Sequence, residues 1–246
     1  HPTRFLDWRY QGDVNLYSAI AQSSNVYFYT VGGGANDIKG LGLDRLHAWW
    51  EKFGLGKKTR VDLPGEAVGF LPTADWKQET HGRPWLLGDT YNVSIGQGDL
   101  SVTPIALIRY IGAIANGGTL YVPHVGISSV PGTFAVRAPL VPPDTSLTAF
   151  ASQIKEAQKG MRATVVNALG TAHVLNDLPF EVSAKTGSAQ VKNNTEENAF
   201  FVGYAPSSDP QIAILILVEN AKLGSLNAVP IAKDVLHWYY EHRLRQ

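Results

Sequence analysis

The chain has 246 residues, of which 44% are apolar and 17% are charged, enough for one globular unit with a sizeable core. Lysine plus arginine and aspartate plus glutamate both number 21, and no basic tract stands out, so we expect no nucleic-acid partner. The absence of cysteine excludes disulfides, thiol catalysis and cysteine-based zinc sites, and the seven histidines are scattered, so we expect no metal or other cofactor.

The longest aliphatic run, IAILILV at residues 212–218, is far shorter than the roughly 20 residues that span a bilayer. We interpret it as a buried strand. The first residues, HPTRFLDW, show neither an initiator methionine nor a signal-peptide pattern. We therefore expect this chain to begin in the middle of a longer protein.

Helical signals dominate the first two thirds of the chain. A helix is predicted after Asp13 as N-cap, ending at SSN, and another over residues 44–54. Residues 56–100 are rich in proline and glycine and predict loops with one short helix after Thr73. The clearest helix follows Thr103, because proline occupies its first position and Asn-Gly-Gly ends it.

The last third has a different pattern. Residues 128–147 predict an irregular connection, followed by a helix to about residue 167. Three strand-like runs come next, over residues 181–191, 198–204 and 211–219. A helix over residues 229–243 closes the chain. Short links make the strands antiparallel neighbours, so we predict one α+β domain over residues 1–246. Its helical lobe covers about 13–170, and its sheet and terminal helix cover about 181–243.

The strand EVSAKTGSAQV carries polar residues at positions where packing favours valine or isoleucine. Lys185 and Gly187 should share one face of this strand, and Thr186 and Ser188 the other. Glycine in a strand often marks the close approach of a ligand. A cation and hydroxyls beside such a gap suit a ligand that bears a carboxylate, whereas a solvated edge strand would explain the same residues without a ligand.

Ser23 and Asn25, in QSSNVYF, lie at a helix end before an aromatic cluster, where such residues commonly act as caps. Together with the downstream Lys-Thr-Gly they form two of the three motifs of serine acyl-enzymes that react with penicillin. The chain resembles the class B penicillin-binding proteins of the elongation type, often called penicillin-binding protein 2. Further similar stretches are VNLYSAIAQSSNVYFY, LPGEAVGFLP, YNVSIGQGDLSVTPIALIRYIGAIANGGTLYVPH, AKTGSAQ and NAFFVGYAP.

This resemblance implies the penicillin-binding protein/serine β-lactamase-like transpeptidase fold and a role for each motif residue. Ser23 would relay protons, Asn25 would hold the substrate amide, and Lys185 would place positive charge beside the nucleophile and the substrate carboxylate. Thr186 and Ser188 would bind that carboxylate, while the Ser188 N–H would stabilise the oxyanion and Gly187 would leave room for the substrate backbone.

By the same resemblance, the protein would be a peptidoglycan D,D-transpeptidase that cross-links stem peptides ending in D-Ala-D-Ala and is acylated by β-lactams. It would lie outside the cytoplasm, anchored to the membrane by its parent chain. Its partner would be a glycan polymerase of the SEDS type.

The chain departs from the family pattern at the nucleophile. The family places Ser-x-x-Lys upstream of Ser-x-Asn, but the 22 residues before Ser23 contain none. The only Ser-x-x-Lys is SQIK, Ser152 to Lys155, which lies between the other two motifs in what reads as a solvent-facing helix side. We therefore expect the C-terminal part of a transpeptidase domain, with the nucleophile helix and first strands outside this chain.

Two other functions fit the same motifs. One is a non-catalytic domain of this fold that senses or binds β-lactams or stem peptides, and it would bind penicillin without a gain in covalent mass. The other is a serine β-lactamase or D,D-carboxypeptidase, which would show hydrolytic turnover.

Overall fold

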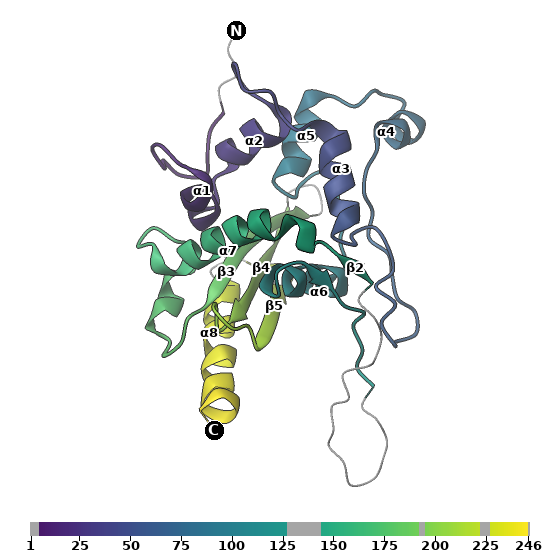
Figure 1. The fold of residues 1–246 in the computed structure, drawn as a ribbon. Coiled ribbons are helices and arrows are strands. Elements are labelled where there is room, and N and C mark those ends of the chain that lie inside the picture. The colour runs from purple at the N-terminus through teal and green to yellow at the C-terminus, as the bar shows by residue number, and fades with distance from the viewer. Residues whose placement is uncertain (1–4, 127–143, 192–194, 222–226, 246) are drawn as a thin grey trace.

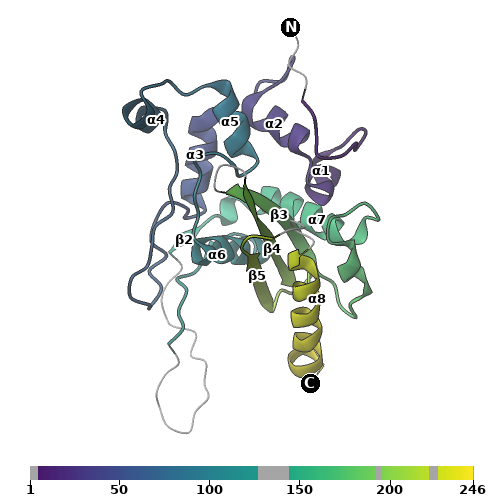
Figure 2. The same cartoon turned by 180° about the vertical axis from the view of Figure 1, so that it is seen from behind.

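A three-stranded antiparallel sheet lies at the centre of the computed structural model, which describes residues 5–126, 144–191, 195–221 and 227–245. Helices α6 (Pro104–Ala115) and α7 (Ala151–Val166) cover one face of the sheet, and α8 (Ala228–Tyr239) covers the other, as opposite views show (Figures 1 and 2). Helices α2, α3 and α5 form a group beyond one end of the sheet, whereas α1 packs against α7. These layers confirm the predicted α+β class.

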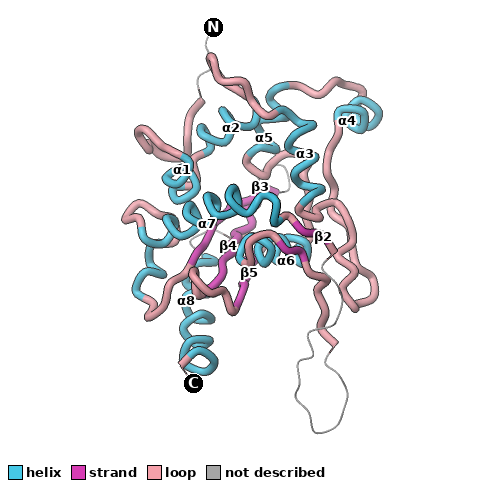
Figure 3. Tube along the Cα trace, in the orientation of Figure 1, coloured by secondary structure: helices cyan, strands magenta, loops and turns pink. Residues whose placement is uncertain are grey.

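The remaining elements complete this framework (Figure 3). The other helices are α1 (Leu16–Gln22), α2 (Asn25–Gly33), α3 (Gly42–Lys52), α4 (Ala74–His81) and α5 (Leu87–Ser94), with 3₁₀ turns at Thr148–Phe150 and His173–Asp177 and a π-helical turn at Tyr240–Leu244. The strands are β1 (Thr119–Leu120), β2 (Thr145–Ser146), β3 (Ser183–Val191), β4 (Glu196–Ala205) and β5 (Ile212–Val218). None of the helices described is long and apolar enough to cross a bilayer.

Local signals predicted several elements correctly. Helix α6 begins after Thr103, whose Oγ1 accepts a hydrogen bond from Ala106 N at 3.4 Å, and it ends at Asn116. The three predicted strands pair in the order β3-β4-β5. Of the irregular connection expected over residues 128–147, the part up to residue 143 lies outside the described residues.

Three local predictions were wrong. Asn15, not Asp13, caps α1, because its Oδ1 accepts from Tyr17 N and Ser18 N at 3.0 Å each. Helix α3 begins at Gly42, so Asp44 lies in its first turn and does not cap the helix. The negative charge of Asp44 is favourable there, near the positive end of the helix dipole. Helix α5 lies where loops were expected, because its Gly, Asp, Thr and Asn residues disfavour helix locally while its packing against α2 favours it.

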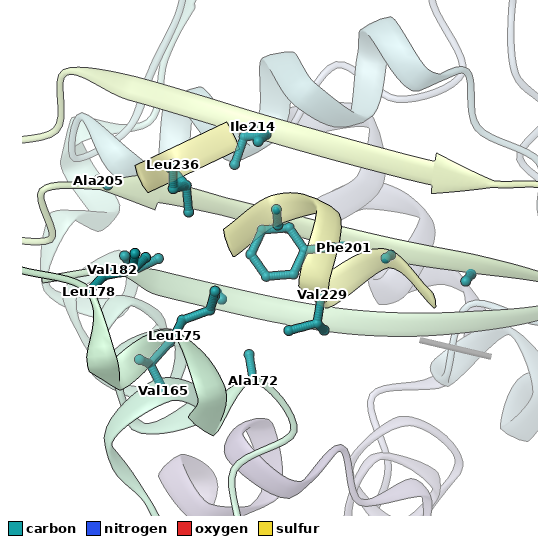
Figure 4. Close-up of a cluster of buried hydrophobic side chains, with 14 of the residues drawn as sticks. Val165, Ala172, Leu175, Leu178, Val182, Phe201, Ala205, Ile214, Val229 and Leu236 are labelled. Carbon is teal, nitrogen blue, oxygen red and sulfur yellow. The ribbon is translucent and has the colours of Figure 1, made fainter. Parts of the chain in front are cut away.

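The alternation of side chains along the strands gives the sheet a hydrophobic cluster on each face. Phe201 of β4 is fully buried on the α8 side, where it packs in a cluster with Val229 and Leu236 (Figure 4). Val202 and Tyr204 face the opposite side and pack with residues of α6 and α7. The sheet is therefore held between two cores, which fixes the position of its β3 edge.

Glycines allow α2 to pack closely against α5. A Cβ atom on Gly32 would lie 1.8 Å from Ser94 Oγ, and one on Gly33 would lie 2.2 Å from Tyr91 Cε1. The glycines therefore let the backbone of α2 pack directly against the side chains of Ser94 and Tyr91 on α5. This contact holds the start of α2 beside the loop that leaves α5.

Candidate active site

A cavity of about 740 Å³ lies between the α1–α2 turn, the loop after α5 and strand β3. Most of the motif residues singled out in the sequence meet there. Its walls are formed by Trp8, Ser23, Ser24, Asn25, Phe28, Tyr29, Ser94, Ile95, Gln97, Tyr110, Thr171, Lys185, Thr186, Gly187, Ser188, Gln190 and Glu197. All six predicted site residues are therefore brought to one cavity.

Ser23 and Lys185 are in direct contact although 162 positions separate them in the chain. Lys185 Nζ donates to Ser23 Oγ at 2.8 Å and to the Thr186 carbonyl oxygen at 2.5 Å. Ser23 ends α1 in the left-handed conformation, with φ of 56° and ψ of 52°. A non-glycine residue adopts this conformation at some cost, and such residues cluster at functional sites.

Burial lowers the pKa of Lys185 from its ordinary value of 10.5 to about 8. The physical cause is loss of hydration, which disfavours the ammonium form. The ammonium of Lys185 donates to two neutral oxygens, those of the Ser23 hydroxyl and the Thr186 carbonyl, and neither offsets its positive charge as a carboxylate would. Lys185 can therefore change its protonation state near neutral pH.

Asn25 is the first residue of α2, and its side chain lines the cavity. The preceding residue, Ser24, is the N-cap, and its hydroxyl accepts from Tyr27 N at 3.3 Å. The turn is held from outside by Asp7, whose Oδ2 accepts from Ser24 Oγ at 2.8 Å. The α1–α2 turn thus presents Ser23 and Asn25 to the same cavity.

Strand β3 is an edge of the described sheet, and its free backbone groups face the cavity. The Thr186 carbonyl accepts from Lys185, and the Ser188 carbonyl accepts from Gln97 Nε2 at 2.8 Å, so both carbonyls point away from β4. In an antiparallel ladder the N–H and C=O of one residue point to the same side. The Ser188 N–H is therefore directed toward the cavity as well.

The hydroxyls of β3 differ in their surroundings. Thr186 is buried, and its Oγ1 donates to Thr171 Oγ1 at 2.6 Å, whereas Ser188 is exposed. Gly187 lies between them, and a Cβ atom there would meet only Phe200 Cβ, at an ordinary distance of 3.5 Å. Packing among the described residues therefore does not require glycine at position 187.

The alternative Ser-x-x-Lys pair lies elsewhere. Ser152 and Lys155 are on the exposed side of α7 and do not line the cavity, and Ser152 Oγ donates to Gln153 Oε1 at 2.7 Å. Their exposure agrees with the solvent-facing position expected from the sequence. Within the described ranges, no group of three or more histidine, aspartate or glutamate side chains is placed to hold a metal ion.

Sequence reasoning missed three residues that shape the cavity. Asp7 holds the α1–α2 turn, Gln97 bridges to β3, and Thr171 bonds Thr186. Gln97 lies between Gly96 and Gly98, both with positive φ, and this Gly-Gln-Gly was the only local signal of a special backbone. Asp7 and Thr171 act through contacts distant in sequence, which no local pattern reveals.

Comparisons with known proteins agree with this geometry. The chain matches the family model for the penicillin binding protein transpeptidase domain over residues 1–237. It is 34% identical over 262 residues to the peptidoglycan D,D-transpeptidase MrdA of Haemophilus influenzae, covering 99% of this chain and 39% of that protein.

Two solved structures are also similar. One is PBP2 of Helicobacter pylori in complex with MreC, with a TM-score of 0.80 and 31% identity, covering 97% of this chain and 43% of that one. The other is PBP2 of Pseudomonas aeruginosa in complex with WCK 5153, with a TM-score of 0.78 and 33% identity, covering 97% and 50%. The chain spans half or less of the length of these three proteins, and it belongs to the penicillin-binding protein transpeptidase domain family.

Proposed function

We propose that this chain forms part of the active site of a peptidoglycan D,D-transpeptidase, which cross-links stem peptides through a serine acyl-enzyme and is acylated by β-lactams. The observation that carries this proposal is the 2.8 Å contact between Lys185 Nζ and Ser23 Oγ inside a cavity that Asn25 also lines. A cation, a hydroxyl and an amide are thereby presented to one ligand. The family relationship supports the same chemistry.

The reaction requires a proton to move in each of two steps. In the first, a serine oxygen bonds to the carbonyl carbon of the penultimate D-alanine, the terminal D-alanine leaves as an amine, and the serine proton ends on that amine. In the second, an amine of a neighbouring stem attacks the ester and the serine regains a proton. Ser23 relays these protons, and the Lys185 ammonium stabilises the negative charge that develops.

The remaining motif residues bind the donor peptide. The Asn25 amide holds the substrate amide, and the Thr186 and Ser188 hydroxyls bind the terminal carboxylate, for which Thr186 must exchange its bond to Thr171. The cavity-facing Ser188 N–H donates to the oxyanion, a contact whose loss typically costs on the order of 10²-fold to 10³-fold in rate. Gly187 leaves space for the peptide backbone.

The nucleophile is supplied, in this proposal, by a Ser-x-x-Lys that precedes these residues in the full-length protein. Two observations support this placement. No Ser-x-x-Lys precedes Ser23 in the chain, and Ser152 and Lys155 do not line the cavity. The MrdA relative is also much longer than the chain that matches it.

Penicillin labelling of the full-length protein tests this function. We expect the intact mass to rise by one penicillin and the adduct to map to a serine upstream of residue 1. Lys185→Ala should slow labelling by on the order of 10³-fold, because it removes the cation from the cavity. Lys155→Ala is the matched control, since Lys155 is exposed outside the cavity, and its labelling should equal that of the wild type.

Four results would contradict the proposal. Equal labelling of Lys185→Ala and wild type would remove Lys185 from the chemistry. An adduct on Ser152 would move the nucleophile to α7. Reversible penicillin binding with no gain in mass would indicate a binding domain, and rapid hydrolysis of the penicillin would indicate a β-lactamase.

We also propose that the full-length protein lies outside the cytoplasm, anchored to the membrane, beside a SEDS-type glycan polymerase. A MreC-type protein is a second expected partner, because the similar PBP2 of Helicobacter pylori was solved with MreC. Cross-linking in intact cells followed by purification of the full-length protein should recover both. Recovery of neither, from cells in which penicillin labels the protein, would argue against these partners but not against the activity.

A further inference from the structure

The segment before α1, residues 5–11, runs along the α1–α2 turn and fastens it. Trp8 Nε1 donates to the Ser23 carbonyl oxygen at 3.0 Å, and Trp8 itself lines the cavity. Arg9 Nη2 donates to the Leu169 carbonyl oxygen at 2.6 Å, two residues before Thr171. One short segment therefore contacts both the Ser23 turn and the loop after α7 that leads to Thr171.

Asp7 is the residue of this segment with the most contacts to the turn. Its Oδ2 accepts from Ser24 Oγ at 2.8 Å and from Val26 N at 3.2 Å. Its Oδ1 accepts from Asn25 N at 3.2 Å and from Trp8 N at 2.9 Å. Both oxygens are thus engaged, three of the four bonds going to consecutive residues at the start of α2.

The start of α2 depends on this remote carboxylate. The helix has no acidic residue in its first turn, and its N-cap hydroxyl, on Ser24, satisfies only one N–H directly. Asp7 accepts from two further N–H groups of the first turn and brings negative charge to the positive end of the helix dipole. Without it, the orientation of Asn25 would be set by the Ser24 cap alone.

The position of Ser23, at the end of α1, also depends on residues 7 and 8. It stands in the left-handed conformation, which an L-residue leaves readily unless its surroundings hold it. Its neighbour Ser24 is held by Asp7, and its own carbonyl is held by Trp8. The position of Ser23 Oγ relative to Lys185 Nζ therefore rests on contacts that residues 7 and 8 supply.

We propose that Asp7 is a positioning residue that fixes the α1–α2 turn so that Ser23 and Asn25 meet Lys185 in the cavity. The expected effect of Asp7 on activity rests on the proposed function. Asp7 touches none of the proposed reacting groups, and it acts through the Ser24 hydroxyl and the N–H groups of α2. Trp8 has the same role for the Ser23 carbonyl, through a single bond.

The test is Asp7→Asn in the full-length protein. The amide has the size of the carboxylate but accepts through one oxygen only, so it cannot hold all four donors. We expect the rate of acylation by labelled penicillin to fall by on the order of 10²-fold, the cost of a small misplacement of catalytic groups. Asp13→Asn, at an exposed aspartate near the same segment, is the matched control and should label at the wild-type rate.

A second readout separates positioning from a general loss of structure. The Ser23 hydroxyl accepts from the Lys185 ammonium and so favours its charged form. If Ser23 moves, the alkaline limb of the pH–rate profile should shift to lower pH in Asp7→Asn. A merely structural role would lower the amount of active protein and leave the shape of the profile unchanged.

Trp8→Phe decides the matter if Asp7→Asn does not fold. It keeps an aromatic ring at the cavity wall and removes only the indole N–H that holds the Ser23 carbonyl. We expect a slower acylation with the same direction of pH shift. Wild-type acylation rates and pH–rate profiles in the folded variants would overturn the inference about Asp7. If Lys185→Ala abolishes labelling in the same assay, the proposed function would stand even though the inference about Asp7 had failed.

Discussion

Two lysines occupy sheltered positions in this molecule, and their partners differ in charge. Lys77 of α4 is 3% exposed, and its Nζ lies 3.1 Å from Asp89 Oδ1 and 2.6 Å from Asp99 Oδ2. Lys185 of β3 is half-buried, and its ammonium donates to the neutral oxygens of Ser23 and Thr186. Both lysines are thus partly or fully withdrawn from solvent, and they differ in counter-charge.

Their pKa values move in opposite directions. Burial alone lowers the pKa of Lys77, but the hydrogen bonds that its ammonium donates to Asp99 and Asp89 outweigh that effect and hold the pKa above its usual value. Burial lowers the pKa of Lys185 to about 8 with no such opposition. A sheltered lysine with carboxylate partners stabilises the fold, whereas one without them is available for proton chemistry.

The two regions are also connected. Asp99 lies just after the Gly-Gln-Gly of the α5–α6 loop, so the ion pair with Lys77 anchors the loop from which Gln97 reaches Ser188. Lys77 thereby supports one wall of the cavity that Lys185 also lines.

The largest expected effect comes from Lys77→Met. It leaves two carboxylates without their shared cation, which should lower the free energy of unfolding by about 3–5 kcal/mol. Urea-induced unfolding of the full-length protein measures this. Lys57→Met is the control, because Lys57 is exposed and its pair with Glu51, at 3.7 Å, should contribute less than about 1 kcal/mol. Equal decreases in the free energy of unfolding in the two variants would show that the buried ion pair stabilises the protein no more than the exposed pair does.

The pH dependence of acylation should follow the protonation of Lys185. If the ammonium is the active form, the rate should fall about tenfold per pH unit above pH 8, as the charge is lost. Lys185→Arg, although slower, should lack this limb because arginine keeps its charge. A wild-type profile that stays flat from pH 7 to pH 10 would show that the charge of Lys185 does not control the reaction.

Lys185→Met should change the free energy of unfolding in the opposite direction to Lys77→Met. The folded-state pKa of about 8 lies below the ordinary 10.5, so the unfolded chain binds the proton more tightly and the charged lysine opposes folding below pH 8. We expect Lys185→Met to raise the free energy of unfolding at pH 7 by on the order of 1 kcal/mol. The difference from wild type should shrink as the pH rises from 8 toward 10.5. Destabilisation at pH 7 would indicate that Lys185 is a structural cation after all.

The smallest effect is expected for Gln97→Ala. It removes one hydrogen bond between the α5–α6 loop and β3, worth about 0.5–1.5 kcal/mol, and should slow penicillin labelling only a few-fold. Gln78→Ala, at an exposed position of α4, is the comparison variant. A loss as large as that of Lys185→Ala would place Gln97 among the reacting groups, and no change would show that the loop holds its position without this bond.

The sequence allowed prediction of those elements whose signals are local. Thr103, Pro104 and Asn116 bound α6 by capping chemistry, and the short links between the last three runs of the chain require antiparallel strands. Helix α5 escaped prediction because tertiary packing against the glycines of α2 outweighs its poor helix propensity.

The candidate site was predictable only in part. The meeting of Ser23 and Lys185 followed from the family resemblance, since no local pattern connects residues 162 positions apart. The burial that lowers the pKa of Lys185 depends on the complete wall of the cavity. Asp7 could not be found from spacing, because a carboxylate 17 positions before Ser24 has no reason to cap its turn until the chain is folded.

The close packing of α2 on α5 bears on how the protein can vary. Gly32 and Gly33 do not themselves line the cavity, yet a Cβ atom at either position would overlap the side chain of Ser94 or Tyr91, so a substitution would shift those side chains or the two helices. Tolerance to substitution should therefore be low at two positions outside the cavity wall. Variants that alter ligand affinity can arise there by tilting α2, without any change in the residues that face the ligand.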